Sequence, residues 1–288
     1  METACMLPPR HKKFAEAIRA EGNPYGRPKK DRHKPYSTVD IDRDGEYLFF
    51  GGCTSAYLLP EVIQDSLKIL QAGKVSHTFL GIDEPCCGSV MFRAGYSKSA
   101  EELALQNVKL FNERGFSKII TVCSGCYRTF NVDYPELLGE VDFKVYHISE
   151  IISNLMSEKR IRLNPIVEEL VTYHDPCHLG IHCGVFDQPR DVIKNAYGTS
   201  FVEMVRNRED SRCCGAGGGV KSAFPEISVA MAEQRLLDAK ATGAKRLLTS
   251  CPFCILNLRD AANQKRIDFA IDDLTTIVAK QLRQEEVQ

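Results

Sequence analysis

The sequence predicts an α/β protein that contains two copies of one domain, each with a mainly parallel sheet flanked by helices. Two observations support this fold class. Ten of the 12 cysteines form two sets of five with the same order and nearly the same spacing, which indicates an internal duplication. In both halves, short apolar runs alternate with segments of helical periodicity, and such alternation produces parallel sheets. We expect a pseudo-two-fold axis to relate the two copies.

Each cysteine set consists of a single cysteine, an adjacent pair followed by glycine, and a C-x-x-C motif. Equivalent cysteines lie 124 to 128 residues apart. Because each C-x-x-C follows a short apolar run, we expect the cysteines just beyond strand ends, where open parallel sheets bind ligands. The first set is Cys53, Cys86, Cys87, Cys123 and Cys126, and the second is Cys177, Cys213, Cys214, Cys251 and Cys254.

The elements around the cysteines repeat as well. Residues 99–115 and 227–243 have helical periodicity and end at glycine. A strand is expected before each adjacent cysteine pair, and a helix, a strand and a second helix are expected after each C-x-x-C. We therefore predict two domains, 46–160 and 168–284, which are joined by the segment between them.

The N-terminal segment, residues 1–45, differs in composition from both domains. Residues 10–36 contain nine Lys or Arg and three acidic residues. Glycines and prolines from Gly22 to Pro28 would end any helix that begins near residues 14–18. We expect a basic extended arm, which either remains solvated or docks against a partner.

Composition excludes several classes of protein. The net charge of -1 and the pI of about 6.7 argue against binding to nucleic acid or to an anionic membrane surface. The longest uncharged stretch, residues 47–60, is too short to span a bilayer. The first residues lack the apolar core of a secretory signal. We expect a cytoplasmic protein with no membrane span.

Three uses of the repeated cysteines compete: disulfides, zinc and iron–sulfur clusters. Disulfide frameworks are typical of small secreted domains. Structural zinc takes four ligands, and five cysteines with two adjacent ones exceed that number. Thiolates are the usual ligands of iron–sulfur clusters, which we therefore predict. Five thiolates per half also suggest a cluster other than a simple cubane. Cys5 and Cys183 lie outside the repeat, and we expect ordinary thiols there.

Each half resembles the CCG domain of the heterodisulfide reductase family, whose signature is a cysteine, then CCG, then C-x-x-C. The resemblance covers residues 46–284, and residues 172–180, 184–190 and 213–219 are similar to the catalytic subunit in its B and D forms. It implies two noncubane [4Fe-4S] clusters, each held by one five-cysteine set. It also implies reduction of a small disulfide, such as the coenzyme M–coenzyme B heterodisulfide of methanogenesis.

The resemblance also implies partners. D-type subunits carry an N-terminal ferredoxin domain, and its C-x2-C-x2-C-x3-C-P run is absent from this sequence. Residues 22–26 resemble the linker that follows that domain. We therefore expect a separate ferredoxin-domain subunit similar to the C-type subunit of heterodisulfide reductase. Electrons would come from a flavoprotein, a hydrogenase or a formate dehydrogenase.

The duplication suggests a mechanism for disulfide cleavage, which consumes two electrons and two protons. A cluster normally passes one electron at a time, so two clusters that face each other across the domain interface could each reduce one sulfur. His178, next to Cys177, is the best candidate for a proton donor, with His174 and His182 as alternatives. It could instead only hydrogen-bond to the cluster or the backbone. Cations that follow motif elements could bind an anionic substrate or could be surface charges, and they are Lys221, Arg93, Arg128 and Arg190.

Glycines accompany the cysteine pairs. Gly88, Gly215 and Gly217 are expected to let the backbone approach the cluster and donate N–H groups to sulfide. Residues 215–222 resemble a phosphate-binding loop, but Val220 occupies a position at which the nucleotide motifs need glycine. We therefore expect no flavin or nucleotide site.

Three alternatives to reduction of a small-molecule disulfide remain. The chain could be the electron-transfer subunit of a lactate, glycolate or glycerol-3-phosphate oxidising system. It could be a zinc-bearing structural subunit. It could also reduce a protein-borne disulfide or trisulfide in sulfur metabolism.

Overall fold

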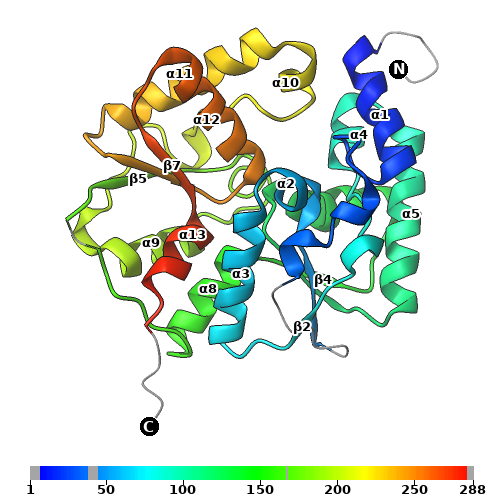
Figure 1. The fold of residues 1–288 in the computed structure, drawn as a ribbon, viewed down its shortest axis with the longest axis horizontal. Coiled ribbons are helices and arrows are strands. Elements are labelled where there is room, and N and C mark those ends of the chain that lie inside the picture. The colour runs from blue at the N-terminus through cyan, green and yellow to red at the C-terminus, as the bar shows by residue number, and fades with distance from the viewer. Residues whose placement is uncertain (1–6, 38–44, 167, 284–288) are drawn as a thin grey trace.

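The computed structural model describes residues 7–37, 45–166 and 168–283, and Figure 1 shows two α/β units side by side. The first unit contains a four-stranded parallel sheet of order β2-β1-β3-β4, and the second a three-stranded parallel sheet of order β5-β6-β7. The predicted fold class, a duplicated α/β unit with parallel sheets, is confirmed.

In the first unit, helices alternate with the strands as the sequence predicts. The strands are short, and the central residues of β1 and β3 are fully buried, as expected for strands covered on both faces. The elements are β1 (Tyr47–Phe50), α2 (Gly52–Leu58), α3 (Pro60–Ala72), β2 (His77–Thr78), α4 (Ser89–Ala94), α5 (Ser97–Glu113), β3 (Lys118–Thr121), α6 (Ser124–Arg128), α7 (Tyr134–Leu138), β4 (Lys144–His147) and α8 (Ile148–Ser157).

The second unit repeats the alternation of strands and helices with fewer elements. The strand expected before Cys213 is reduced to a single parallel bridge between Phe201 and Val171, directly after a 3-10 turn (Gly198–Ser200). The elements are β5 (Val171–His174), α9 (Asp187–Tyr197), α10 (Val220–Ala223), α11 (Pro225–Lys240), β6 (Arg246–Thr249), α12 (Pro252–Lys265), β7 (Ala270–Asp273) and α13 (Leu274–Gln281).

Two helix pairs join the units in a pseudo-symmetric way. Helix α3 packs against α13, and α8 packs against α9. In each pair, the last helix of one unit contacts the helix that follows the first strand of the other. The largest apolar cluster therefore contains residues of both units, such as Ile63, Leu155, Val192 and Val278. Burial of this shared surface holds the two sheets in one fixed arrangement.

The N-terminal segment differs from the extended arm that we expected. It begins with helix α1 (Pro9–Glu21), which ends at Gly22 in the left-handed conformation that glycine adopts readily. Phe14, Ala15 and Ile18 lie on one face of this helix and pack beside Met91. The many basic residues concealed this apolar stripe, which is buried at i, i+1 and i+4. Residues 1–6, including Cys5, and 38–44 lie outside the described residues.

Helix α1 contacts both units. On one side its apolar face covers α4 and α5, and on the other it contacts α10. His11 Nε2 lies 3.0 Å from the carbonyl oxygen of Gly219, and Arg10 donates to the carbonyl of Ser222. The predicted domain limits remain a prediction, but the helix before residue 46 is packed against both units. Within the described part of the chain, no helix combines the length and apolarity needed to cross a bilayer.

A buried ion cluster stabilises the second unit. Arg190, 1% exposed, donates to both carboxylate oxygens of Asp175, at 2.7 and 2.9 Å, and also to Glu203. Asp175 follows β5 directly and also accepts the N–H of Arg208. Arg190 is therefore a structural group in α9, and its guanidinium is already committed to these carboxylates.

We predict that Arg190→Met lowers the free energy of unfolding by about 3–5 kcal/mol, because it leaves the buried Asp175 carboxylate without its partner. Urea denaturation followed by circular dichroism would measure the change. Lys194→Met on the exposed face of the same helix is the control, for which we expect a change within about 0.5 kcal/mol. Equal losses in the two variants would contradict the assignment.

Candidate metal centre

The structure places the cysteines at the carboxyl ends of strands. Cys53 follows β1, Cys123 follows β3, Cys177 follows β5 and Cys251 follows β6, each within three residues of the strand end. Helices begin at or beside three of these positions. Because parallel strands end at one edge of a sheet, four separate sequence segments deliver their thiols to the same region.

The structure brings together the two predicted sets in two separate pockets. All five cysteines of the first set line one pocket, and all five of the second set line the other. The two pockets share four lining residues: Ser89, Val90, Gly125 and Phe253. The five-cysteine sets are therefore neighbours across a thin wall at the interface of the two units.

Two contacts tie the C-x-x-C turns of the two units together. Ser124 Oγ donates to the carbonyl oxygen of Ser250 at 2.6 Å. A thiol–thiol interaction links the residues on either side of this bond, Cys123 and Cys251. Gly125 lies between the two units: a Cβ at this position would be 3.5 Å from Cys123 Sγ and 3.7 Å from His178 Nδ1.

The thiols of each set are close enough to share protons. Cys126 Sγ lies 3.2 Å from Cys87 Sγ, and hydrogen bonds from Cys126 and Cys86 lower the pKa of Cys87 to about 6. A hydrogen bond from Cys177 likewise lowers the pKa of Cys213 to about 2. The donors Cys126 and Cys177 have raised pKa values for the same reason. Each set thus contains at least one thiol that readily becomes a thiolate, the form that binds metals.

The donor set matches iron–sulfur chemistry. Each pocket offers five sulfur atoms from one chain, and none of the described cysteines forms a disulfide. Four thiolates are enough for a simple cluster or for zinc, so each pocket has one ligand more than either needs. Both pockets could hold an iron–sulfur cluster. Cys183, by contrast, lines neither pocket, and partial burial raises its pKa to about 11.

An arginine from the N-terminal segment supports the first pocket, a role that no pattern in the sequence indicates. Arg32 is 1% exposed and donates to Cys53 Sγ at 2.9 Å and to Glu84 at 2.6 Å. Glu84 in turn accepts the N–H groups of Gly51 and Gly52 at the start of α2. The segment that we expected to be an extended arm, either solvated or docked against a partner, therefore supplies a buried cation to the first cysteine set.

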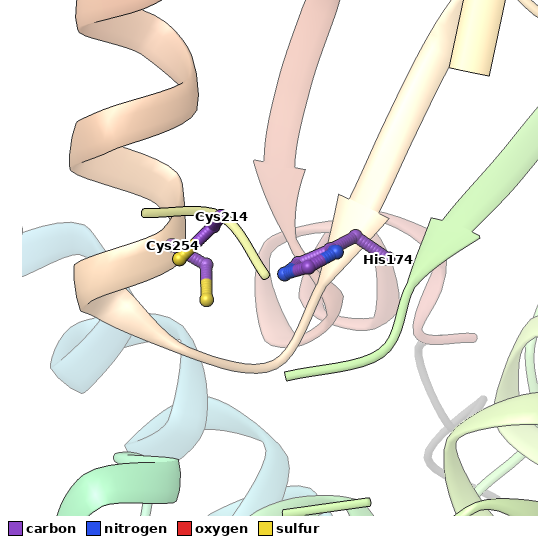
Figure 2. Close-up of side chains that lie close together, drawn as sticks. All are labelled: His174, Cys214 and Cys254. Atoms are coloured by element: carbon purple, nitrogen blue, oxygen red, sulfur yellow. The ribbon is translucent and has the colours of Figure 1, made fainter. Parts of the chain in front are cut away.

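A histidine lies beside the second pocket. His174, the last residue of β5, is fully buried, and one of its ring nitrogens and the Sγ atoms of Cys214 and Cys254 all lie within 4.8 Å of one another. Figure 2 shows the ring directed toward the two sulfurs. Burial, with Arg235 nearby, lowers the pKa of His174 to about 3. Its ring is therefore neutral, which weighs against the proton-donor role that we considered for it.

Histidine and arginine side chains lie in and beside the second pocket. His178 and Arg93 line the pocket, and the rings of His178 and the exposed His182 are 5.5 Å apart. Arg93 and Arg128 both pair with Asp133, the latter at 3.8 Å. Burial and these two arginines lower the pKa of His178 to about 4, so its role as a proton donor remains a prediction that requires a negative charge nearby.

Lys221 lies outside both cysteine pockets. Its ammonium group bonds Asp260 at 2.5 Å and Asn257 at 2.8 Å, and it does not line either pocket. These partners hold α10 against α12. Of the four cations that we considered for substrate binding, the structure places Arg93 in the lining of the second pocket, and neither pocket is lined by Lys221, Arg128 or Arg190.

The family follows from comparison with known proteins. The cysteine-rich domain called CCG matches residues 47–131 and 171–259. The D-type subunit of dihydromethanophenazine:CoB–CoM heterodisulfide reductase from Methanosarcina mazei is 39% identical over 274 residues, which cover 93% of this chain and 67% of that protein. The chain belongs to the heterodisulfide reductase family of CCG-domain proteins. Like its relatives, it is an iron–sulfur oxidoreductase.

Members of the family differ in their named reactions. The B-type subunit of fumarate reductase (CoM/CoB) from Methanothermobacter marburgensis is 36% identical over 75% of this chain and 42% of that protein. EtfAB:quinone oxidoreductase of Syntrophomonas wolfei is 33% identical over 76% of this chain and 31% of that protein. The chain spans less than half of these two relatives. A hypothetical protein from Helicobacter pylori has a similar fold, with a TM-score of 0.59 at 9% identity over 90% of this chain and 54% of that one.

The glycines of the two CCG motifs have different structural constraints. Gly215 has a φ of +81°, and a Cβ there would lie 2.6 Å from the carbonyl oxygen of Ser228. Gly88 has a φ of +82°, but its Cβ would meet only ordinary contacts. Both donate their N–H toward the cysteine two residues earlier. Gly217 lines the second pocket and has open space around it.

We predict that alanine at these positions destabilises the protein in the order Gly215, Gly88, Gly217. Gly88→Ala should cost about 1–2 kcal/mol for the left-handed backbone, and Gly215→Ala more, because its neighbour is backbone. Gly217→Ala should be nearly neutral. Urea denaturation and the iron content of each variant would give the order, and a loss at Gly217 as large as at Gly215 would contradict it.

Proposed function

We propose that this chain is the catalytic subunit of a heterodisulfide reductase-like complex. The reaction would be RSSR′ + 2 e⁻ + 2 H⁺ → RSH + R′SH, with a small anionic disulfide such as the coenzyme M–coenzyme B heterodisulfide as substrate. The observation that carries this proposal is the pair of complete five-cysteine pockets with a shared wall. A protein that only relays electrons does not need two matched sites that adjoin.

The ten cysteines would hold two noncubane [4Fe-4S] clusters, one in each pocket. When bound, these clusters would supply the two electrons singly and the iron that holds substrate sulfur. A disulfide that reaches both pockets would lie against the shared wall. That place is beside Gly125 and Phe253, where the side chain of Phe253 would exclude water from the sulfurs.

Arg93, which lines the second pocket, would bind the substrate. It shares the carboxylate of Asp133 with Arg128, so one negative charge faces two positive charges. The remaining charge favours an anionic group on the disulfide. His178 would then lie between the bound anion and Cys177, where it could hydrogen-bond to the departing thiol.

A second candidate function is electron transfer for a different oxidoreductase. It is favoured by the relatives that are named for fumarate reductase (CoM/CoB) and EtfAB:quinone oxidoreductase. In either case the relatives named as subunits support a complex. We propose a ferredoxin-domain partner similar to the C-type subunit of heterodisulfide reductase, which receives electrons from a flavoprotein, a hydrogenase or a formate dehydrogenase. A direct assay of disulfide reduction separates the two functions.

We predict that the loaded protein contains about eight iron atoms per chain, as two four-iron clusters require, and reduces disulfides with a viologen as electron donor. Cys87→Ser or Cys214→Ser should each leave four thiolates in one pocket, too few for a five-cysteine cluster, and reduce thiol formation to background. Cys183→Ser is the matched control and should retain both iron and activity. Activity in both ligand variants, or zinc in place of iron, would refute the two-cluster reaction.

We also predict that Arg93→Gln raises KM for an anionic disulfide by about tenfold or more, since a charge-assisted hydrogen bond contributes about 1.5–3 kcal/mol. An uncharged disulfide should show little change in KM. Lys221→Gln, which removes a charge outside the pocket, should leave both values as they are. A stronger effect from Lys221→Gln than from Arg93→Gln would contradict our placement of the substrate.

A further inference from the structure

We propose that His174 donates its Nε2 hydrogen to a sulfur atom of the cluster held by the second cysteine set, and so raises the reduction potential of that cluster. The inference rests on the proposed function, because it requires a cluster in that pocket. It adds a tuning residue that the cysteine motif does not contain.

The first observation is an unpartnered polar atom. His174 is fully buried at the end of β5, and its Nε2 has no hydrogen-bond partner among the described residues. Buried polar atoms are almost always paired, so an orphaned ring nitrogen indicates a missing acceptor. The nearest chemistry is sulfur, since the ring and the Sγ atoms of Cys214 and Cys254 form one group within 4.8 Å.

The second observation identifies which ring nitrogen carries hydrogen. Arg235 Nε donates to His174 Nδ1 at 3.0 Å. A guanidinium can only donate, so Nδ1 must accept, and the neutral ring must then carry its hydrogen on Nε2. Arg235 is itself held by the carbonyl oxygen of Arg206 at 2.7 Å and by Asp238 at 3.5 Å. The tautomer is therefore determined by a buried network.

This tautomer makes His174 a hydrogen-bond donor and not a sixth ligand. A ligating nitrogen needs a free lone pair. Nδ1 uses its lone pair to accept from Arg235, and Nε2 carries the hydrogen. To bind iron, the ring would have to lose that hydrogen and become an imidazolate. Donation to a cysteine sulfur or a sulfide needs no such change.

The third observation comes from the pseudo-symmetry. His174 pairs with Thr249 in the second sheet, and Phe50 pairs with the equivalent Thr121 in the first. Both residues precede the first cysteine of their set by three positions. The first pocket thus has a phenyl ring where the second has an imidazole. Phe50 packs on Phe111 and Phe130 and offers no donor.

The energetic consequence has a definite sign. A reduced cluster carries more negative charge than an oxidised one, so an N–H donor stabilises the reduced form more. Loss of one hydrogen bond to a charged group should change the equilibrium constant of reduction by about tenfold, which is about 59 mV for a one-electron couple. Removal of the donor should therefore make the potential more negative.

The experiment is an EPR-monitored redox titration of the loaded protein and two variants. His174→Phe installs the residue found at the pseudo-equivalent position, and His174→Gln retains an N–H donor of similar reach. We expect one of the two cluster potentials in His174→Phe to fall by about 59 mV while the other stays unchanged. The potentials of His174→Gln should remain close to those of the wild type.

A second measurement detects the histidine directly in the wild type and does not rely on a change in potential. In wild-type protein with ¹⁵N-labelled histidine, pulsed EPR of the paramagnetic cluster should detect a weakly coupled ring nitrogen that is absent from His174→Gln. A strong coupling typical of an iron-bound nitrogen would overturn the proposal, as would unchanged potentials in His174→Phe. Absence of any cluster in the wild type would instead refute the proposed function on which the inference rests.

Discussion

The structure depends on one constraint, the burial of ten thiol groups that must bind metal as thiolates. Burial in an apolar interior opposes the charged form of a thiol, and eight of these cysteines are buried. Groups beside the cysteines offer hydrogen bonds to sulfur: the N–H groups of Gly88 and Gly215, the guanidinium of Arg32 and, on our proposal, the imidazole of His174. Each donor favours negative sulfur, so the fold prepares both pockets for a cluster before any iron arrives.

The pairing of helices between the units then determines what the pockets can do together. Because α3 packs on α13 and α8 on α9, the carboxyl ends of both sheets meet at the interface. The bond between Ser124 and Ser250 fixes the two C-x-x-C turns at that point. One sheet alone could build one pocket. Only the duplicated arrangement places a second pocket against the same four wall residues. A reaction that takes up two electrons, one from each pocket, would require two adjacent pockets of this kind.

The repeat made the fold class and the grouping of cysteines predictable, because equal spacing carries over directly to equivalent strand ends. Long-range pairing was not predictable. Lys221 and Arg190 follow motif elements in the sequence, yet Asp260 and Asp175 bind them in the fold. Similarly, the basic composition around α1 concealed an apolar face. No local signal indicates that Arg32 reaches Cys53, since the contact depends on how the whole N-terminal segment docks on the first unit.

The two copies differ in exposure and charge, and these differences indicate at which pocket a substrate would enter. All cysteines of the first set are buried, whereas Cys177 and Cys213 of the second are partly exposed. The packed N-terminal segment contributes Pro24 to the lining of the first pocket and Arg32 as a partner of Cys53, whereas Arg93 lines the second pocket. In the proposed reaction, an anionic disulfide would enter at the second pocket and would reach the first pocket from the interior of the protein. A donor such as His174 would then act on the cluster nearer to solvent, where water competes most for charge.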